Sequence, residues 1–259
     1  MQVLSSNKRI DRKIELLLAI QTRQSITLDE LERLVGVSNS TLRRDLREMI
    51  DTGYIRMTAG RIERVATTGE EVPFALRKLL NREEKQRIAL AALDLIHNGE
   101  SVFISGGTTT YELARLLPAR RRLTVITNSL RVANAVVDSN GIDLVILGGK
   151  VRPEEQTMHG HLTEWAAQEL RADKFFYGIP AVHAVHGLTH GQTIEVSTDR
   201  FMANAATQVI VLVDHTKFGK VAPALVLAIK ALDVIITGRE VSPEIVESIS
   251  AQNVRILLV

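Results

Sequence analysis

Apolar residues near the start of the chain recur at the three- and four-residue intervals that are typical of helices. Residues 7–20 place Ile10, Ile14, Leu17 and Leu18 on one face, which predicts a first helix. A second helix is predicted to follow Thr27-Leu28-Asp29-Glu30, because this segment has the form of a capping box. Gly36-Val37 interrupts that pattern, and Ser38 is suited to cap a third helix that runs to about Thr52.

Two short alternating segments come after the third helix. Residues 54–57 and 61–65 are joined by Thr58-Ala59-Gly60, and this pattern predicts a small hairpin. Three helices and a hairpin predict a winged helix-turn-helix domain over residues 1–66. Residues 67–80 have no clear periodicity and contain Gly69 and Pro73, so we expect a linker there.

The pattern from residue 81 to residue 259 differs from that of the first domain. A helix is predicted over residues 82–96, and apolar strands then alternate with glycine turns and helices. Strands that are apolar on both faces and separated by helices indicate a mainly parallel sheet covered on each side. We therefore predict an α/β domain over residues 81–259. Its strands are expected at residues 101–104, 123–127, 144–147, 175–177, 209–213 and 234–236, and its helices include residues 110–117 and one that ends near Val137.

The third helix divides into two faces at 100° per residue. Leu42, Leu46, Met49 and Ile50 share one sector, which is the expected core face. The first turns of such a helix enter the major groove of DNA, where arginine binds guanine and small polar side chains reach base edges or phosphates. The hairpin arginines, including Arg64, are expected to meet the DNA backbone or a minor groove. The residues predicted to bind DNA are Ser38, Asn39, Ser40, Thr41, Arg43, Arg44, Arg47, Arg56 and Arg61.

An alternative interpretation is that these arginines form a solvated helix face, balanced by Asp45, Glu48 and Asp51. The preceding capped helix, the tight turn and the following hairpin together favour DNA binding. We expect Asp45 to orient a neighbouring arginine rather than to contact a base, because it lies beside the core face.

Charge and composition restrict the function further. The net charge is only +2, but residues 1–66 hold 12 Lys/Arg and 9 Asp/Glu, so the basic excess lies in the first quarter of the chain. Cysteine is absent, which excludes disulfides and thiolate catalysis. The first residues are polar and unlike a signal peptide, and the longest aliphatic run, Val209–Val213, is too short to span a bilayer. We expect a cytoplasmic protein with no membrane partner.

Gly106 and Gly107 lie where a predicted strand leads into a helix. Glycines let the backbone approach an anion, helix-start amides point outward, and Thr108-Thr109-Thr110 adds three hydroxyls. The turn matches neither a P-loop nor a dinucleotide fingerprint, so a monophosphate is the expected ligand. An ordinary tight connection is the alternative.

Further polar residues follow other predicted strands. Asn128 and Ser129 come after the second strand, Gly148 follows the third, and Lys217 lies just past the strand at residues 209–213. Open α/β sheets bind ligands at the carboxyl ends of their strands. We expect Lys217 to pair with the phosphate, although a solvated loop lysine would also fit.

Residues 37–46, Val-Ser-Asn-Ser-Thr-Leu-Arg-Arg-Asp-Leu, strongly resemble the helix-turn-helix signature of the DeoR/GlpR family of sugar-metabolism repressors. Six later segments resemble successive motifs of that family's effector domain and occur in the same order. They are Glu84-Lys85-Gln86-Arg87-Ile88-Ala89, Gly107-Thr108-Thr109-Thr110, Thr127-Asn128-Ser129-Leu130, Leu147-Gly148-Gly149, Gly187-Leu188-Thr189 and Asp214-His215-Thr216-Lys217-Phe218-Gly219.

The resemblance implies a sugar-phosphate isomerase-like fold for the second domain, and a repressor of a carbohydrate-utilisation operon that a phosphorylated sugar or polyol releases from its operator. The chain departs from the family where Ser105 and Gly178-Ile179-Pro180 replace segments that usually carry aspartate, and where Asp199 replaces a common lysine. Glu195 matches a family acidic position. We therefore expect either an unusual effector or a pocket that binds the sugar hydroxyls through Ser105, His183, Gln192 or Glu195. The predicted effector site consists of Ser105, Gly106, Gly107, Thr108, Thr109, Thr110, Asn128, Ser129, Gly148, His183, Glu195 and Lys217.

Several histidines raise the possibility of a metal. His183 and His186 lie in a glycine-containing loop without a regular helix to align them, and no cysteine is available. We expect neither a metal nor a cofactor, and we expect His183 and His190 to be hydrogen-bonding groups of the ligand pocket.

Two other functions are alternatives to repression. A sugar-phosphate isomerase would fit the implied ancestry, but it needs a positioned base and a second acid–base partner, and Ser105 and Pro180 stand where carboxylates are expected. We therefore predict that the chain is not an enzyme. Activation in place of repression stays open. One winged helix contacts few base pairs, so we expect a homo-oligomer, a dimer or tetramer, on double-stranded operator DNA.

Overall fold

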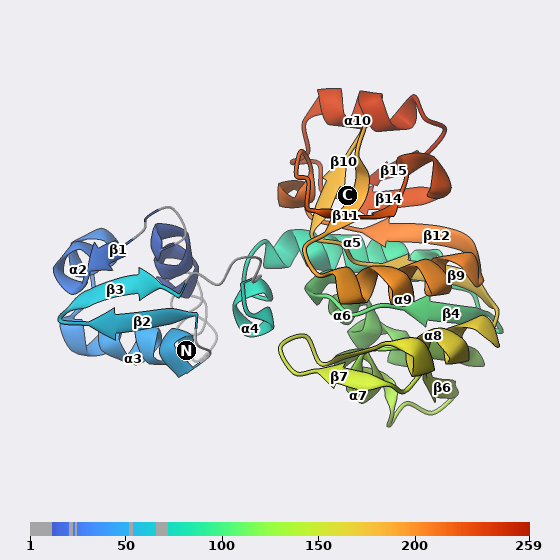
Figure 1. The fold of residues 1–259 in the computed structure, drawn as a ribbon, viewed down its shortest axis with the longest axis horizontal. Helices are drawn as coiled ribbons and strands as arrows, with labels where there is room; N and C mark the ends of the chain where they lie inside the picture. The colour runs from blue at the N-terminus through green and yellow to red at the C-terminus, as the bar shows by residue number, and fades with distance from the viewer. Residues whose placement is uncertain (1–11, 21–22, 24, 52–53, 66–71) are drawn as a thin grey trace. The chain divides into compact units, whose positions relative to one another are not determined.

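The structure is a computed structural model that describes residues 12–259, apart from 21–22, 24, 52–53 and 66–71. The chain forms two compact units, Met1–Leu80 and Asn81–Val259. Figure 1 shows the first unit in blue and the second from green to red. Among the described helices, none is long and apolar enough to cross a membrane.

The first unit is a helix-turn-helix with a small antiparallel sheet. Residues 12–20 are helical, and this helix is followed by α2 (Leu28–Val35) and α3 (Asn39–Asp51). The predicted start of the first helix, residues 7–11, lies outside the described residues. The sheet has the order β1-β3-β2, with β1 at Ser25–Thr27, β2 at Ile55–Thr58 and β3 at Arg61–Arg64. The predicted hairpin is thus joined by a third strand, β1, that the sequence pattern did not indicate.

Local sequence explains the turn between the two helices. Thr27 and Glu30 form the predicted capping box at the start of α2, and Gly36 ends α2 with a left-handed φ of 66°. Glycine adopts this conformation without the steric penalty of a side chain. Leu42, Leu46 and Met49 of α3 are fully buried, whereas Ile50 is 36% exposed, so the core face of α3 is narrower than predicted.

The segment between the two predicted domains contains structure of its own. Helix α4 (Phe74–Arg77) lies within the range expected to be a linker. Leu76 is buried in the core of the first unit, where Val72 and Leu80 also pack. The described residues from 72 to 80 therefore belong to the first unit, which ends at Leu80.

The second unit is built on a seven-stranded sheet in which every pair of neighbours is parallel. This agrees with the predicted mainly parallel α/β domain. The strand order is β15-β14-β12-β9-β4-β5-β6. The strands are β4 (Ser101–Ile104), β5 (Leu123–Thr127), β6 (Ile142–Ile146), β9 (Ala172–Tyr177), β12 (Ala206–Leu212), β14 (Val234–Thr237) and β15 (Arg255–Leu258).

Alternate strand residues supply two separate cores. Phe103, Phe175 and Val211 belong to one buried cluster, and Ile104, Phe176 and Ile210 belong to the other. Successive side chains of a strand point to opposite faces, so each strand contributes to both cores. The second cluster includes residues of α5 (Arg82–Asp94), α6 (Thr108–Leu116) and α7 (Leu130–Val136), and the first includes residues of α8 (His161–Gln168), α9 (Thr193–Asn204) and α10 (Pro243–Ser250).

Two small antiparallel sheets accompany the main sheet. One is the hairpin of β7 (Lys150–Arg152) and β8 (Thr157–His159), and the other has the order β10-β11-β13. The strands of the second are β10 (Ala181–His183), β11 (Gly187–His190) and β13 (Ala224–Leu227), and the remaining short helical turns are η1 (Leu117–Ala119), η2 (His215–Lys217) and η3 (Ile229–Ala231).

Candidate functional site

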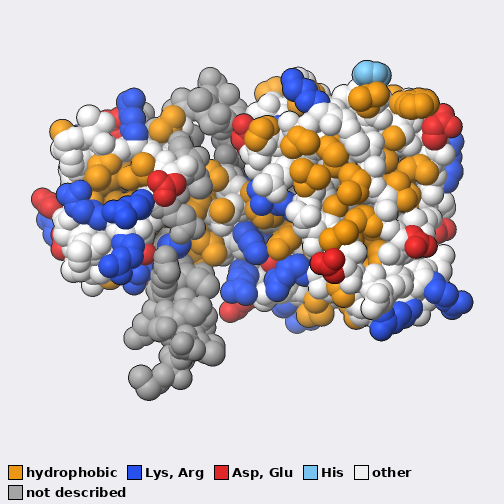
Figure 2. Space-filling view, turned by 90° about the horizontal axis from the view of Figure 1, so that it is seen from below, with side chains coloured by type: hydrophobic (Ala, Val, Ile, Leu, Met, Phe, Trp, Pro, Cys, Tyr) orange, Lys and Arg blue, Asp and Glu red, His pale blue; other side chains and the backbone are white. Residues whose placement is uncertain are grey.

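Helix α3 presents a basic face to solvent. Arg43, Arg44 and Arg47 are exposed, while Leu42 and Leu46 on the opposite side are buried. Figure 2 shows lysine and arginine side chains gathered on the first unit. The amphipathic pattern of α3 thus places three arginines where they can reach a nucleic acid. That they contact DNA stays a prediction.

The polar residues at the start of α3 form hydrogen bonds with one another. The hydroxyl of Ser38 lies 3.1 Å from both the Ser40 and the Thr41 hydroxyls, and Arg43 Nε donates to Asn39 Oδ1 at 2.7 Å. These bonds reduce the freedom of the side chains before any ligand binds. Asp45 is buried and pairs with Arg12 at 2.5 Å, so it orients an arginine of the first helix.

The hairpin arginines are also exposed. Arg56 pairs with Glu63 at 2.8 Å, and Arg61 Nη2 donates to the Ser25 hydroxyl at 2.7 Å. These contacts hold both side chains along the sheet. The side chain of Arg64 lies outside what the structure describes.

The predicted glycine turn joins β4 to α6. Helix α6 begins at Thr108, two residues earlier than the sequence pattern suggested, so all three threonines lie in its first turn. Gly107 has φ 141°, a conformation that favours glycine, and Thr110 Oγ1 donates to its carbonyl at 3.1 Å. Ser105 accepts from the Gly178 amide at 3.1 Å and so ties the turn to the end of β9.

The end of β5 contributes two buried polar residues. Asn128 Nδ2 donates to the Met158 carbonyl at 3.2 Å, but Asn128 Oδ1 has no hydrogen-bond partner among the described residues. Ser129 caps α7 by accepting from the Val132 amide. The Gly148 carbonyl accepts from the Thr163 hydroxyl at 2.7 Å, so Gly148 is engaged in packing α8.

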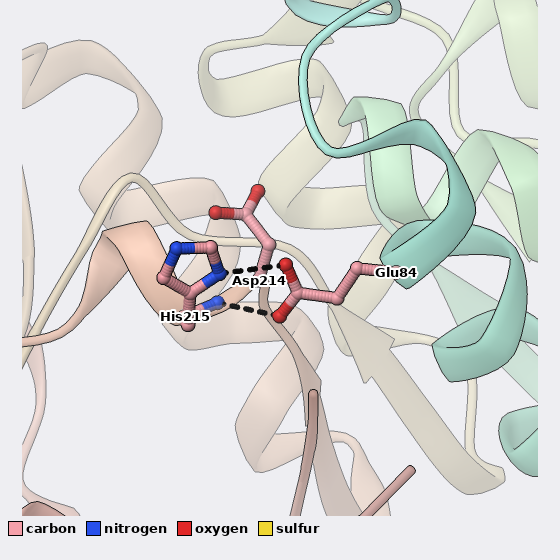
Figure 3. A group of neighbouring side chains, drawn as sticks. All are labelled: Glu84, Asp214 and His215. Carbon is pink, nitrogen blue, oxygen red and sulfur yellow. Dashed lines mark hydrogen bonds and ion pairs between the residues drawn. The ribbon is translucent and has the colours of Figure 1, made fainter. Parts of the chain in front are cut away.

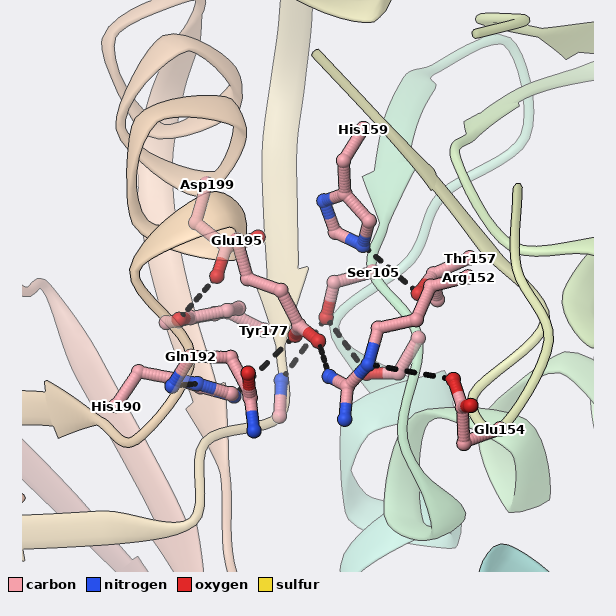
Figure 4. A network of polar contacts seen from close by, with 12 residues as sticks. Ser105, Arg152, Glu154, Thr157, His159, Tyr177, His190, Gln192, Glu195 and Asp199 are labelled. Atoms are coloured by element: carbon pink, nitrogen blue, oxygen red, sulfur yellow. Dashed lines mark hydrogen bonds and ion pairs between the residues drawn. The ribbon is translucent and has the colours of Figure 1, made fainter. Parts of the chain in front are cut away.

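Polar side chains from several elements lie close together near Ser105, as Figure 4 shows. We use the term polar wall for Arg152, Thr157, His159, His190 and Glu195. Arg152 of β7 and Glu195 of α9 form an ion pair, and His190 Nε2 lies 3.2 Å from the other oxygen of Glu195. His159 Nε2 bonds to Thr157 Oγ1 at 2.8 Å, whereas His159 Nδ1 has no partner among the described residues.

The polar wall and the glycine turn are in direct contact. A Cβ on Gly106 would overlap Thr157 Cγ2, so only glycine fits beneath β8. Ser129 and Thr157 also form an isolated bridge. The glycine turn and the polar wall therefore lie next to each other.

Burial controls the charges within the polar wall. Burial raises the pKa of Glu195 above its ordinary value, although the positive charge of Arg152 opposes the shift. Burial lowers the pKa of His159, which keeps this ring neutral near pH 7. The wall thus contains a cationic donor in Arg152, an acceptor carboxylate in Glu195 and a neutral imidazole in His159.

A second carboxyl of α9 lies next to the wall. Asp199 is buried and accepts from the Tyr177 hydroxyl at 2.6 Å. Burial raises the pKa of Asp199 well above its ordinary value, and that of Tyr177 rises for the same reason. Asp199 is therefore a hydrogen-bonding group of the interior.

His183 has a different environment from the one expected. Its Nδ1 accepts from the Val185 and His186 amides at 3.1 and 3.3 Å, and its ring packs against His186. These bonds close the β10–β11 turn. The structure does not bring His183 together with Glu195, whereas His190, at the far end of β11, is in contact with it.

Lys217 lies in η2, after β12, where its positive charge helps to lower the pKa of Asp214. Among the described residues, one group has the spacing of metal ligands, namely Glu84, Asp214 and His215. Figure 3 shows that Glu84 already bonds to His215. A metal would have to displace these bonds.

The sequence pattern did not identify Arg152, Thr157, His159 or Asp199 as site residues. The β7–β8 hairpin, which contains Arg152, Thr157 and His159, is too short to show a periodic pattern. The one indication available was position, because Arg152 and Thr157 follow a glycine pair at the end of a predicted strand.

An arginine-faced helix-turn-helix unit, joined in one chain to an α/β unit with polar strand ends, defines a DNA-binding regulator with a separate sensor. Residues 12–68 match the DeoR-like helix-turn-helix domain, and residues 80–239 match the DeoR C terminal sensor domain. The chain belongs to the DeoR family of transcriptional regulators. This agrees with the prediction that it is not an enzyme.

Relatives align over most of the chain. The HTH-type transcriptional repressor CsqR of Escherichia coli K12 is 32% identical, over 83% of this chain and 81% of its own. The transcriptional repressor AccR of Agrobacterium fabrum and the regulator IolR of Bacillus subtilis are each 29% identical, over 89% and 87% of this chain and 90% and 89% of theirs.

Among solved structures, the fold is similar to that of ribose 5-phosphate isomerase A from Methanocaldococcus jannaschii. That likeness has a TM-score of 0.40 and 21% identity, and covers 53% of this chain and 55% of the other. Chaetomium thermophilum eIF2B beta has a TM-score of 0.41 at 17% identity, covering 88% of this chain and 65% of its own.

Proposed function

We propose that this protein represses a carbohydrate-utilisation operon and leaves its operator when a phosphorylated sugar or polyol binds the second unit. The observation that carries the proposal is the contact between the glycine turn and the polar wall, which brings groups suited to a phosphate close to groups suited to hydroxyls. Family membership and the exposed arginines of α3 support the DNA-binding half. Relatives named as repressors favour repression over activation.

The glycine turn is suited to the phosphate. Gly106 and Gly107 open α6, whose first amides carry the positive end of the helix dipole. The hydroxyls of Thr108 and Thr109 are buried beside them, and Lys217 would supply a compact positive charge from the loop after β12.

The polar wall is suited to the hydroxylated end of the effector. A sugar hydroxyl both donates and accepts, so it pairs well with arginine donors and carboxylate acceptors together. Arg152 and Glu195 offer both kinds of group, and the unpartnered His159 Nδ1 is a further bonding position. Glu195 and Glu154 balance the charge of Arg152, which favours a neutral polyol end over a second phosphate.

Self-association would complete the DNA-binding protein. Two copies on half-sites about 34 Å apart would double the contacted base pairs. In the second unit, Leu162 and Trp165 of α8 are 54% and 63% exposed, and hydrophobic side chains gather on one face of that unit in Figure 2. Large exposed apolar groups of this kind support a homo-oligomer.

The test measures binding to the chain's own upstream DNA and to random DNA by fluorescence anisotropy at several salt concentrations. The purified protein should prefer its own upstream region, and a sugar phosphate should weaken that binding. Arg44→Ala should lower operator affinity by a factor of about 10 or more, because one good base contact contributes about 1–3 kcal/mol. Effector affinity should stay unchanged.

Arg171→Ala is the matched control for charge. Arg171 is exposed in the second unit and bonds to the Gln168 and Leu170 carbonyls, so its loss should leave operator binding intact. The proposal is wrong if the wild type does not distinguish its own upstream region from random DNA. Thermal shifts with sugar and polyol phosphates identify the effector, since a ligand at 100 times its Kd adds about 2.7 kcal/mol.

A further inference from the structure

The first turn of α5 is bonded to the loop that carries Lys217. Asn81 is the first residue of the second unit, next in sequence to the last residue of the DNA-binding unit, and α5 begins at Arg82. The loop after β12 contains Asp214 and His215, followed by Thr216 and Lys217. Two buried carboxylates hold these segments together.

Glu84 is the first of these carboxylates and is 4% exposed. It accepts from the His215 amide at 2.8 Å and from the Gly238 amide at 3.2 Å, and His215 Nδ1 lies 2.8 Å from its second oxygen. Figure 3 shows Glu84 reaching from α5 to the His215 ring and backbone. One helix residue thus binds the loops that follow both β12 and β14.

Asp214 is the second carboxylate and is 1% exposed. It accepts from Asn81 Nδ2 at 3.2 Å and from the amide and hydroxyl of Thr216, and it lies 3.9 Å from Lys85 Nζ. Burial would raise its pKa, but Lys217, Thr216 and Lys85 outweigh burial and lower it. The charged form of Asp214 is therefore stabilised in part by Lys217, the lysine that is proposed to bind the phosphate.

An anion bound to Lys217 would weaken the electrostatic stabilisation of the Asp214 carboxylate. A phosphate attracts the lysine charge that now helps to stabilise Asp214, and it adds negative charge next to a buried carboxylate. A shifted position of the loop after β12 would then be more stable than the present one. The hydrogen bonds of Asn81 and Glu84 would transmit this shift to the first turn of α5. The chain from the DNA-binding unit enters at that turn.

We propose that Asn81, Glu84 and His215 are positioning residues that transmit effector binding at Lys217 to the start of α5, and hence to operator affinity. The inference rests on the proposed function. It predicts that breaking these contacts uncouples the two units without removing either binding activity.

The experiment uses the full chain with Asn81→Gly and His215→Ala. Asn81 has φ 50°, so glycine keeps the backbone conformation and removes only the amide side chain. His215→Ala removes the ring contact and retains the backbone bond to Glu84. Arg87→Ala is the control, because Arg87 lies on the same helix in an exposed pair with Glu240.

Two quantities are measured for each variant by titration. One is the Kd for the tightest binder among inorganic phosphate, glucose 6-phosphate, fructose 6-phosphate and sorbitol 6-phosphate. The other is the ratio of operator Kd with and without that compound at saturation. Couplings of this kind are typically about 5- to 150-fold. We expect both variants to lower the ratio toward 1, with the Kd for the compound within about threefold of wild type, and Arg87→Ala to behave as wild type.

The inference is overturned if both variants release operator DNA with the wild-type ratio, or if they lose the compound altogether. A wild-type protein that binds none of the four compounds, or binds one without releasing DNA, overturns the proposed function itself. Circular dichroism melting separates a misfolded variant from an uncoupled one, and Glu84→Gln, which weakens the same contacts from α5, provides a further test.

Discussion

Buried carboxyl groups on α9 have their charge set by their surroundings. Glu195 faces Arg152 and His190, whereas Asp199 contacts the Tyr177 hydroxyl. Burial disfavours a charged carboxylate, and a nearby cation or a hydrogen bond to the charged form offsets that effect. Glu195 has such a cation in Arg152, and the pKa of Asp199 is accordingly the more strongly raised of the two.

Asp199→Asn tests this difference through the pH dependence of stability. A carboxyl whose pKa is raised by folding contributes stability that is complete below its unfolded pKa, about 3.9, and is lost as pH rises through its folded pKa. Asparagine still accepts from Tyr177 and does not titrate. The free energy of unfolding of Asp199→Asn relative to wild type should therefore rise with pH, by up to about 1.4 kcal/mol per unit.

Chemical denaturation from pH 4.5 to 8 measures this difference. Asp173→Asn is the control, because hydrogen bonds from Ser101 lower the pKa of Asp173 and its effect should be flat over that range. A flat difference for Asp199→Asn, or one that falls with pH, would show that Asp199 is charged in the folded protein.

At the scale of elements, the β4–α6 turn and the β7–β8 hairpin fit together closely. A methyl group on Gly106 would overlap Thr157 Cγ2, and Thr157 is held in place by its bond to His159. Gly106→Ala should lower the free energy of unfolding by about 1–3 kcal/mol, as overpacking of a buried contact does. It should also weaken binding of the phosphorylated effector, because β8 has to shift.

The second substitution Thr157→Ser removes the overlapping methyl group and keeps the hydroxyl. The double variant should recover most of the stability lost in Gly106→Ala, and thermal unfolding of the four proteins measures the coupling. Additive effects would mean that the two residues do not contact each other. Gly60→Ala is not a suitable control, because Gly60 has φ 76° and alanine would be strained there.

Elements with strong local patterns could be predicted from the sequence. Strands β4 and β5 have the predicted bounds, because strands buried on both faces are rich in apolar residues. The capping box at Thr27 and the break at Gly36 were also predicted, since a few neighbouring residues determine each of them. Strands β10, β11 and β13 were not, because each has only three or four residues and shows no clear period.

The same distinction applies to the candidate site, where a local motif could be predicted and contacts between distant residues could not. The glycine turn is recognisable because two adjacent glycines follow an apolar strand. The polar wall is not, since Arg152 and Glu195 are 43 residues apart and meet only when α9 folds over the sheet. His183 and His190 look equivalent in the sequence. In the fold, His183 of β10 pairs with Gly187 at the start of β11, whereas His190 lies at the other end of β11.

At the scale of the whole molecule, the proposed function requires two sites that influence each other without sharing residues. A phosphorylated compound could also release DNA simply by competing for Arg44 and Arg47, which are exposed. Competition and coupling differ in the operator Kd that they give at high effector concentration. Direct competition raises the apparent operator Kd without bound, whereas coupling raises it to a plateau set by the coupling free energy.

We expect a plateau when operator Kd is measured against effector concentration at constant ionic strength. The same factor should appear in reverse, because saturating operator DNA must weaken effector binding by the ratio that the effector imposes on DNA. Sulfate at matched ionic strength is the control, since protein–DNA affinity falls with salt for any phosphate-contacting protein. An operator Kd that rises steadily, with sulfate as effective as the sugar phosphate, would place the anion on α3 and remove the need for a sensor.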